Sequence, residues 1–355
     1  MKNRISAIQG RLRKHGADAV WLSFLPDVRW ACGFTGSNGL LIVGSDAAHF
    51  LSDGRYAAQA HREVEDASVH IPEGSLIDYA AEKQLIGEGD TALFQADHVT
   101  VAKRETFGEK LSGVQWEPVS DFLVESVAAK EAYEVERVRG AQAITEDVFD
   151  YLCGFIAPGQ TERAIASEIV YQHLKRGAER MSFDPIVASG PNSSLPHARP
   201  TNRKLRNGDM VVIDMGGVVD GYASDMTRTI AVGHADDEAR AHYDVVLDAQ
   251  ERAIAAAHAG MTGKELDAVA RSVIENAGLG AYFSHSLGHG IGLQTHEWPR
   301  LSQRVEHTLP EGATVTIEPG VYVREQHGIR IEDIVVLRAD GCENLTTAPK
   351  GLMVL

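Results

Sequence analysis

The chain has 355 residues, of which 44% are hydrophobic and 24% are charged. That composition is ordinary for a globular protein and excludes disorder, collagen and coiled coil, while the length fits two domains of about 150 residues or more each. The formal net charge of −16 argues against nucleic acid or an anionic membrane as a partner, because like charges repel.

The first half alternates between expected helices and expected strands, which favours a small α/β layer domain. The pattern predicts a helix over residues 3–15, strands at Ala19–Leu22, Leu40–Val43 and His49–Leu51, a helix at Tyr56–Glu65, and strands at Thr91–Phe94 and near Trp116.

A long helical pattern without proline begins at about residues 126–140, and we place the domain boundary there, giving domains 1–127 and 128–355. The second half has helices at Thr161–Arg176 and Asp236–Ala259, a helix opened by the capping box Thr262–Glu265, and apolar strands at 210–214, 224–232, 313–318 and 328–337. Helices and antiparallel strands in separate runs predict an α+β fold for this half.

Cysteine usage and the start of the chain bear on the compartment. Cys32, Cys153 and Cys342 are few, odd in number and far apart, which fits a reducing compartment rather than a disulfide framework or a zinc ribbon. The opening MKNRISAIQGRLRKHG is charged where a signal peptide needs an apolar stretch, and no run approaches the about 20 apolar residues of a membrane span. We expect a soluble, cytoplasmic protein.

Carboxylates inside the apolar strands are the most informative feature of the sequence. Asp214, Glu318 and Glu332 each end or interrupt a run of aliphatic residues. A carboxylate in such a place is costly unless it is paired, protonated or bound to a metal. For one acid alone, a salt bridge or a solvated strand edge is the simpler interpretation. For four such acids, counting Asp225, bound cations are the better one.

A hairpin turn predicts how two of these acids meet. Asp220-Gly221 is a strong two-residue turn signal, and a turn there pairs Val219 with Tyr222. In that register Asp214 and Asp225 lie on one face as diagonal neighbours, unless a bulge at the glycines 216–217 shifts the pairing. Two acids converging from one hairpin suit a pair of metal ions about 3.5–4 Å apart.

Alternation along the strand GIRIEDIVV also places Arg330 and Glu332 on one face. An arginine two residues from a ligating carboxylate can orient it through a hydrogen bond.

Four histidines lie where chemistry would use them. His285, His289 and His296 occupy the glycine-rich stretch FSHSLGHGIGLQTHEWP, where glycine permits close backbone approach. His197 lies in a polar loop rich in turn formers, as at the rim of a cleft. Three familiar motifs do not match. GHGIG lacks the spacing of a dinucleotide-binding loop, and the segment from His296 has arginine where a zincin needs its second histidine. No G-x-S-x-G nucleophile elbow of a serine hydrolase occurs.

Taken in order, Asp214, Asp225, His289, Glu318 and Glu332 resemble the five metal ligands of the pita-bread metallopeptidases, peptidase family M24. This is the family of methionine aminopeptidase, aminopeptidase P and prolidase. In the second half, the resemblance rests on the segments IDMGGVVDGYASDMTRT, HSLGHGIGL, TIEPGVY and GIRIEDIVV. GFTGSNGLLIV and LSDGRYAAQA resemble the N-terminal domain of bacterial Xaa-Pro peptidases. The resemblance implies a pita-bread catalytic domain preceded by a smaller creatinase/prolidase-like α/β domain.

The resemblance also implies roles for site residues. Asp214 would bind one metal ion, His289 and Glu318 the other, and Asp225 and Glu332 both. Manganese is the family's usual ion, with cobalt or zinc as alternatives, and a ligand set dominated by oxygen is consistent with Mn²⁺.

The chemistry follows from the metal pair and its neighbours. A bridging water would lose a proton and attack, with Glu318 as proton shuttle, and His197 and His296 would donate to the carbonyl and the oxyanion. His285, Tyr322 and Arg330 resemble the family's residues on the substrate side. The resemblance further implies a homodimer acting on short peptides with proline second.

We therefore expect an Xaa-Pro aminopeptidase, with an Xaa-Pro dipeptidase (prolidase) as the alternative. The two differ in whether the product side of the pocket is open or capped by a positive group that captures the dipeptide's carboxylate. A metal-free creatinase-like hydrolase and a non-catalytic binding homologue are weaker alternatives, because all five ligand types are intact.

Overall fold

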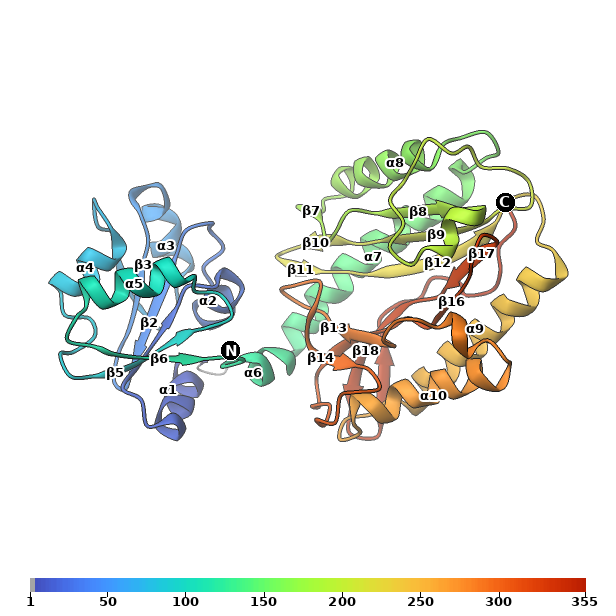
Figure 1. Ribbon diagram of the computed structural model, residues 1–355. Helices are drawn as coiled ribbons and strands as arrows, with labels where there is room; N and C mark the ends of the chain where they lie inside the picture. The colour runs from blue at the N-terminus through green and yellow to red at the C-terminus, as the bar shows by residue number, and fades with distance from the viewer. Residues whose placement is uncertain (1–3) are drawn as a thin grey trace. The chain divides into compact units, whose positions relative to one another are not determined.

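The computed structural model describes residues 4–355, so residue 3, where the first helix was predicted to begin, lies outside the described residues. The chain divides into two compact units, the first ending at Val127 and the second running from Ala128 to Leu355 (Figure 1). Within the described part of the chain, no helix combines the length and the apolar character needed to cross a bilayer.

The first unit is a mixed sheet of six strands with helices between them. Its elements are α1 (Arg4–His15), β1 (Ala19–Leu22), α2 (Leu25–Cys32), β2 (Leu40–Gly44), β3 (Ala48–Leu51), η1 (Gly54–Tyr56), α3 (Ala57–Glu63), β4 (Ser68–His70), α4 (Leu76–Glu82), β5 (Thr91–Gln95), α5 (Val101–Lys110), β6 (Gln115–Val119) and α6 (Val124–Ala128). The strand order is β4-β3-β2-β1-β5-β6, with β1 parallel to β5 and antiparallel to β2.

The predicted strands of this unit are confirmed, but the helix predicted at Tyr56–Glu65 was too long. It is a 3₁₀ turn followed by α3, because the Asp53 carboxylate accepts the Arg55 N–H and caps the turn first. The sequence prediction missed α2, although Pro26 opens that helix and Gly33, with φ +84°, closes it.

The second unit contains short sheets and four long helices. Its elements are α7 (Ala132–Phe155), α8 (Glu162–Lys175), β7 (Arg180–Met181), β8 (Ile186–Ser189), η2 (Gly190–Ser194), β9 (Met210–Met215), β10 (Gly217–Val219), β11 (Tyr222–Ala223), β12 (Met226–Ala231), α9 (Asp237–Ala256), α10 (Gly263–Asn276), η3 (Gly280–Tyr282), β13 (Gly288–Gly290), β14 (Glu297–Leu301), β15 (Thr314–Ile317), β16 (Gly320–Val323), β17 (His327–Arg330), β18 (Asp333–Arg338) and β19 (Gly341–Asn344).

The helices cover the strands of the second unit in two pairs (Figure 1). Helices α7 and α8 pack on β8, β9 and β12 through one apolar cluster, and α9 and α10 pack on β15 to β18 through another. The predicted helix starts are confirmed, since Thr161 and Asp236 cap α8 and α9 and the Thr262–Glu265 capping box opens α10.

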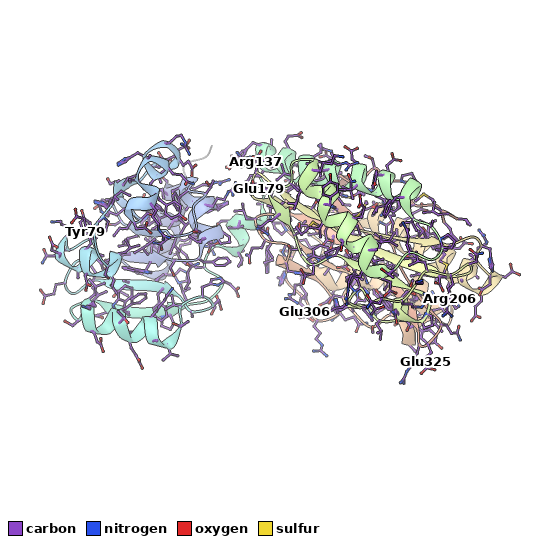
Figure 2. The ribbon with its side chains drawn as sticks, turned by 90° about the horizontal axis from the view of Figure 1, so that it is seen from above. Tyr79, Arg137, Glu179, Arg206, Glu306 and Glu325 are labelled. Carbon is purple, nitrogen blue, oxygen red and sulfur yellow. The ribbon has the colours of Figure 1, made fainter. Side chains whose placement is uncertain are left out.

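The predicted hairpin register is confirmed on both sides of the two glycines 216 and 217. Val219 pairs with Tyr222, and Thr227 pairs with Asp214. Glu179, labelled in Figure 2, accepts the Gly221 N–H at 3.2 Å and so fixes the turn. No residue is inserted on either strand, so Asp214 and Asp225 keep their predicted places.

Two predicted strands are each interrupted beside a site carboxylate. The strand predicted at 224–232 breaks before Met226, and the one predicted at 328–337 breaks at residues 331–332, where the chain leaves its pairing with β16 and joins β15. Asp225 and Glu332 therefore lie at bends rather than inside a ladder, which leaves their side chains free to turn towards a common point.

A buried ion pair fixes the second of these bends from behind. The Arg228 guanidinium, 1% exposed, donates to Asp333 at 2.8 Å and to the backbone oxygens of Thr227, Glu332, Ala348 and Pro349. All five of its N–H donors are thereby used. This residue joins β12, β18 and the C-terminal segment.

We predict that Arg228→Met lowers the free energy of unfolding by about 3–5 kcal/mol, because the buried Asp333 carboxylate then keeps only Lys350 as a cationic partner and several carbonyls lose their donor. Urea denaturation measures this. The control is Arg338→Met at the end of β18, where an exposed pair with Glu343 is worth about 1 kcal/mol or less. Equal effects of the two substitutions would contradict this role of Arg228.

Candidate functional site

The sequence-predicted site residues converge on one cavity of about 460 Å³ in the second unit. All of them line it except Tyr322, which is 7% exposed and lies behind its wall. The cavity is lined by His197, Asp214, Asp225, His285, His289, His296, Glu318, Arg330 and Glu332, among others. The hairpin β9–β12, the strand β13 and the segments after β15 and β17 supply most of these side chains.

Three of the predicted metal ligands form a tight group. Ligand atoms of Asp225, His289 and Glu332 all lie within 4.8 Å of one another, and no other such group occurs in residues 4–355. The His289 Nε2 atom is 3.5 Å from Glu318 Oε1 and 3.7 Å from Asp225 Oδ2. Asp214 lines the same cavity from β9.

The donor set fits divalent cations. Among the described residues, one oxygen each of Asp214, Asp225 and Glu332 is buried without any hydrogen-bond partner. Buried carboxylate oxygens without a partner carry a large desolvation cost, and they are ligands that hard divalent ions prefer. Bound cations would satisfy these oxygens.

The imidazole of His289 has the tautomer that a metal ligand needs. Its Nδ1 lies 3.0 Å from the carbonyl oxygen of Gly290, and because a carbonyl can only accept, Nδ1 carries the proton. Burial, with a contribution from His296, lowers the pKa of His289 to about 3. The ring is therefore neutral, and the Nε2 lone pair is left facing the carboxylates.

Burial and mutual repulsion act on the carboxylates in the metal-free site. Burial, together with the neighbouring acids, raises the pKa of Asp225 and of Glu332 well above the ordinary range. Burial is also the main cause that raises the pKa of Glu318 to about 8, with Asp214 contributing. Without cations, Glu318 would therefore hold its proton at neutral pH, and Asp225 and Glu332 would lose theirs less readily than ordinary carboxyl groups do.

The hydrogen bond predicted from Arg330 to Glu332 goes elsewhere. Arg330 Nη2 donates to Asp214 Oδ2 at 2.6 Å, while Glu332 accepts from Thr227 Oγ1 at 2.7 Å. The interrupted strand explains the difference, because β17 ends at Arg330 and the regular alternation of side chains does not continue to Glu332. Each of these two carboxylates thus has one oxygen fixed by a donor and the other without a partner.

The residues predicted on the substrate side form a chain of hydrogen bonds. Arg330 Nη1 donates to the Tyr322 hydroxyl at 2.7 Å, which lies 2.9 Å from His285 Nε2. The Nδ1 of His285 lies 2.8 Å from the Ser286 carbonyl and so carries its proton. Burial, helped by Arg330, lowers the pKa of His285 to about 4, so Nε2 accepts from the tyrosine. Both ring nitrogens are engaged, which leaves a ring face for a ligand.

His197 and His296 differ from the other two histidines. Both are exposed in the cavity, and neither imidazole forms a hydrogen bond within the described part of the chain. The His296 ring lies 4.2 Å from the His289 ring, centroid to centroid. Their nitrogens are available to a bound molecule.

An ion pair on α10 holds the loop that carries His285. Asp267, fully buried, accepts from Arg271 at 2.7 Å and from the Leu287 N–H at 3.0 Å. Arg271 donates in turn to the His285 carbonyl at 2.9 Å. The Leu287 carbonyl then accepts the Glu318 N–H at 2.8 Å, so the same loop fixes the backbone of a predicted ligand.

Glycine is required at position 288, where β13 packs closely against β15. A Cβ on Gly288 would lie 2.0 Å from the Thr316 carbonyl oxygen, so no other residue fits without a backbone shift. This close approach is what brings His289 against Glu318.

Two arginines on the cavity wall were missed by the sequence analysis. Arg199 and Arg300 are exposed there, and neither forms an ion pair with another described residue. The only signal for Arg300 was its position after His296, which was used to exclude a zincin.

The raised pKa of Glu318 predicts how the metal-free protein responds to pH. In the chelated protein, the folded state keeps its proton up to about pH 8, whereas the unfolded carboxyl loses it near 4.5. The folded state binds more protons in this window, so the free energy of unfolding should fall as the pH rises through it. Urea denaturation of chelated protein measures the slope. Glu318→Gln should flatten it, and identical slopes would contradict the prediction.

Comparisons with known proteins agree with this geometry. The profile of Metallopeptidase family M24 matches residues 136–339, and that of the Creatinase/Prolidase N-terminal domain matches residues 4–129. The chain is 34% identical over 354 residues to an Xaa-Pro dipeptidase of Pyrococcus furiosus, covering 99% of this chain and 100% of the relative.

Solved structures match over the full length. An Xaa-Pro dipeptidase from Bacillus anthracis superposes with a TM-score of 0.96 at 34% identity, covering 99% of both chains. An X-Pro aminopeptidase from Thermotoga maritima superposes with a TM-score of 0.91 at 36% identity, covering 97% of this chain and 99% of that one. The predicted fold, a pita-bread domain after a creatinase-type domain, is confirmed. The chain belongs to metallopeptidase family M24.

Proposed function

We propose that this protein is a two-metal exopeptidase that hydrolyses the Xaa-Pro bond of dipeptides. The relatives are mainly named Xaa-Pro dipeptidases, so they favour the dipeptidase alternative over the aminopeptidase that was predicted first. The similarity to an X-Pro aminopeptidase keeps that activity as the second candidate.

The observation that carries the proposal is the group of unpartnered carboxylate oxygens around His289. We assign Asp214 to one ion, His289 and Glu318 to the other, and Asp225 and Glu332 to both. The oxygen-rich donor set supports Mn²⁺, with Co²⁺ or Zn²⁺ as substitutes. The same oxygens argue against the metal-free creatinase-like hydrolase and the non-catalytic homologue, since either would leave them unsatisfied.

The ions would supply a water nucleophile at neutral pH and polarise the scissile carbonyl. Glu318 would take the water's proton and pass it to the leaving nitrogen. His197 and His296 would donate to the substrate carbonyl and to the oxyanion, and one such donor is worth about 2.7–4 kcal/mol. Because proline gives a tertiary amide, no amide hydrogen needs an acceptor at the scissile bond.

The two free arginines support a dipeptide rather than a longer peptide. A guanidinium at the cavity wall without a carboxylate partner is suited to bind the free carboxylate of a short substrate in a bidentate pair. We assign this role to Arg300, which follows His296 on the same segment. Arg199 lies on the His197 segment and would contribute charge to the same end of the substrate.

Two further expectations are kept as proposals, namely a homodimer and a cytoplasmic location. Sedimentation equilibrium of the purified protein at micromolar concentration tests the first, and a single species of monomer mass would exclude it.

We predict that protein stripped with a chelator is inactive and that Mn²⁺ restores hydrolysis of Ala-Pro, with Ala-Pro cleaved faster than Ala-Pro-Ala. Release of free alanine measures both. A preference for the tripeptide would overturn the dipeptidase assignment, and full activity in the stripped protein would overturn the metal mechanism.

We further predict that Arg300→Met raises the KM for Ala-Pro by about tenfold to a hundredfold, because a hydrogen bond between charged groups is lost. The KM for Ala-Pro amide, which has no carboxylate, should hardly change. Arg304→Met is the matched control, since Arg304 lies on the same segment but does not line the cavity. An equal change for both substrates would contradict the role of Arg300.

A further inference from the structure

Glu162, the first residue of α8, is a fully buried carboxylate that lies outside the cavity. Its Oε1 accepts from the Ser189 N–H at 2.8 Å and the Ser189 hydroxyl at 2.7 Å. Its Oε2 accepts from the Thr201 N–H at 2.9 Å and the Thr201 hydroxyl at 2.5 Å. The Asn192 amide lies 3.1 Å from both oxygens. One side chain thus accepts from three residues of a single segment.

These donors stand at the two ends of a loop. Ser189 ends β8, Thr201 lies twelve positions later (201 − 189 = 12), and His197 is between them. One carboxylate oxygen binds each end, so Glu162 closes residues 189–201 into a loop of fixed width. Arg203 donates to the Ser189 hydroxyl at 2.7 Å and strengthens the same end.

His197 depends on that loop for its place in the cavity. Its imidazole forms no hydrogen bond within residues 4–355, and the side chain is exposed. Near the middle of the loop, the Pro196 carbonyl accepts from Arg330 Nη1 at 3.1 Å. The Ser193 hydroxyl oxygen, also within the loop, accepts the Gly328 N–H at 2.8 Å. Since no hydrogen bond holds the ring itself, the loop backbone, whose two ends Glu162 binds, determines where the imidazole points.

Electrostatics keep Glu162 ionised in this role. Burial works to raise the pKa of Glu162, but hydrogen bonds from Thr201 and Ser189 outweigh burial and hold the pKa below its ordinary range. The start of α8 adds the favourable end of a helix dipole. An acceptor-only group is what this set of N–H and O–H donors requires.

We propose that Glu162 is the positioning residue for His197, closing the loop that presents this imidazole to the substrate carbonyl. The inference rests on the proposed function for the role of His197, whereas the closure of the loop rests on the contacts alone. Glu162→Gln would point an amide N–H₂ at donors on one side of the loop and so release that end.

The test is a double-mutant cycle on Mn²⁺-loaded protein with Ala-Pro. We expect Glu162→Gln to lower kcat about a hundredfold, as a misplaced catalytic group does, with little change in KM. In the His197→Ala background, the same substitution should change kcat by no more than about twofold, because the residue acts through His197. If Glu162 had a purely structural role, the two substitutions would act independently and their fold-reductions in kcat would multiply.

Hydrogen exchange gives a readout that does not depend on activity. Exchange should be faster in residues 189–201 of Glu162→Gln and unchanged around His289, and Mn²⁺ affinity should be unchanged. Glu146→Gln is the matched control, because Glu146 also accepts from a threonine N–H and hydroxyl, those of Thr347, away from the cavity. Its kcat should stay within about twofold of the parent.

Unchanged kcat and exchange in Glu162→Gln, or multiplicative losses in the cycle, would overturn the proposal. If Glu162→Gln does not fold, Thr201→Val removes one donor and should give a smaller fall in kcat that also vanishes in the His197→Ala background. A parent protein that cleaves no Xaa-Pro substrate would overturn the proposed function instead. In that case, faster exchange confined to residues 189–201 would still support the loop closure and unchanged exchange would refute it.

Discussion

Repulsion among three buried carboxylates and a fourth that is partly exposed is the constraint on which the catalytic domain depends. Asp214, Asp225, Glu318 and Glu332 line one cavity, and burial with mutual repulsion raises the pKa of the last three. Such a cluster is stable only when it binds protons or cations. Asp214, Asp225 and Glu332 each have one oxygen without a hydrogen-bond partner among the described residues. The fold therefore holds ligand geometry that is unfavourable until positive charge arrives.

The surroundings are organised to keep that geometry. Arg330 and Thr227 each fix one oxygen of a carboxylate and leave the other for a cation. The pair Asp267–Arg271 and the carboxylate of Glu162 hold, from outside, the loops that carry the histidines. Most of the site residues lie at bends and in loops. Buried polar contacts give these segments the rigidity that a regular strand would otherwise supply.

Much of the site could be predicted from the sequence, because its signals are local. The turn at Asp220-Gly221 predicted the register, and carboxylates within apolar runs indicated the residues that we propose as ligands. The predicted hydrogen-bond partner of Arg330 was wrong because the alternation of side chains holds only along an unbroken strand, and β17 ends before Glu332. Glu162 gave no signal, since its partners lie 27 to 39 positions away and only the folded loop brings them together.

Anomalous diffraction from crystals grown with Mn²⁺ tests the central claim most directly, because it locates the ions themselves. The account predicts two peaks in this cavity, about 3.5–4 Å apart, both within bonding distance of Asp225 and Glu332. A single peak, or ions bound elsewhere on the chain while these carboxylates stay protonated, would contradict it.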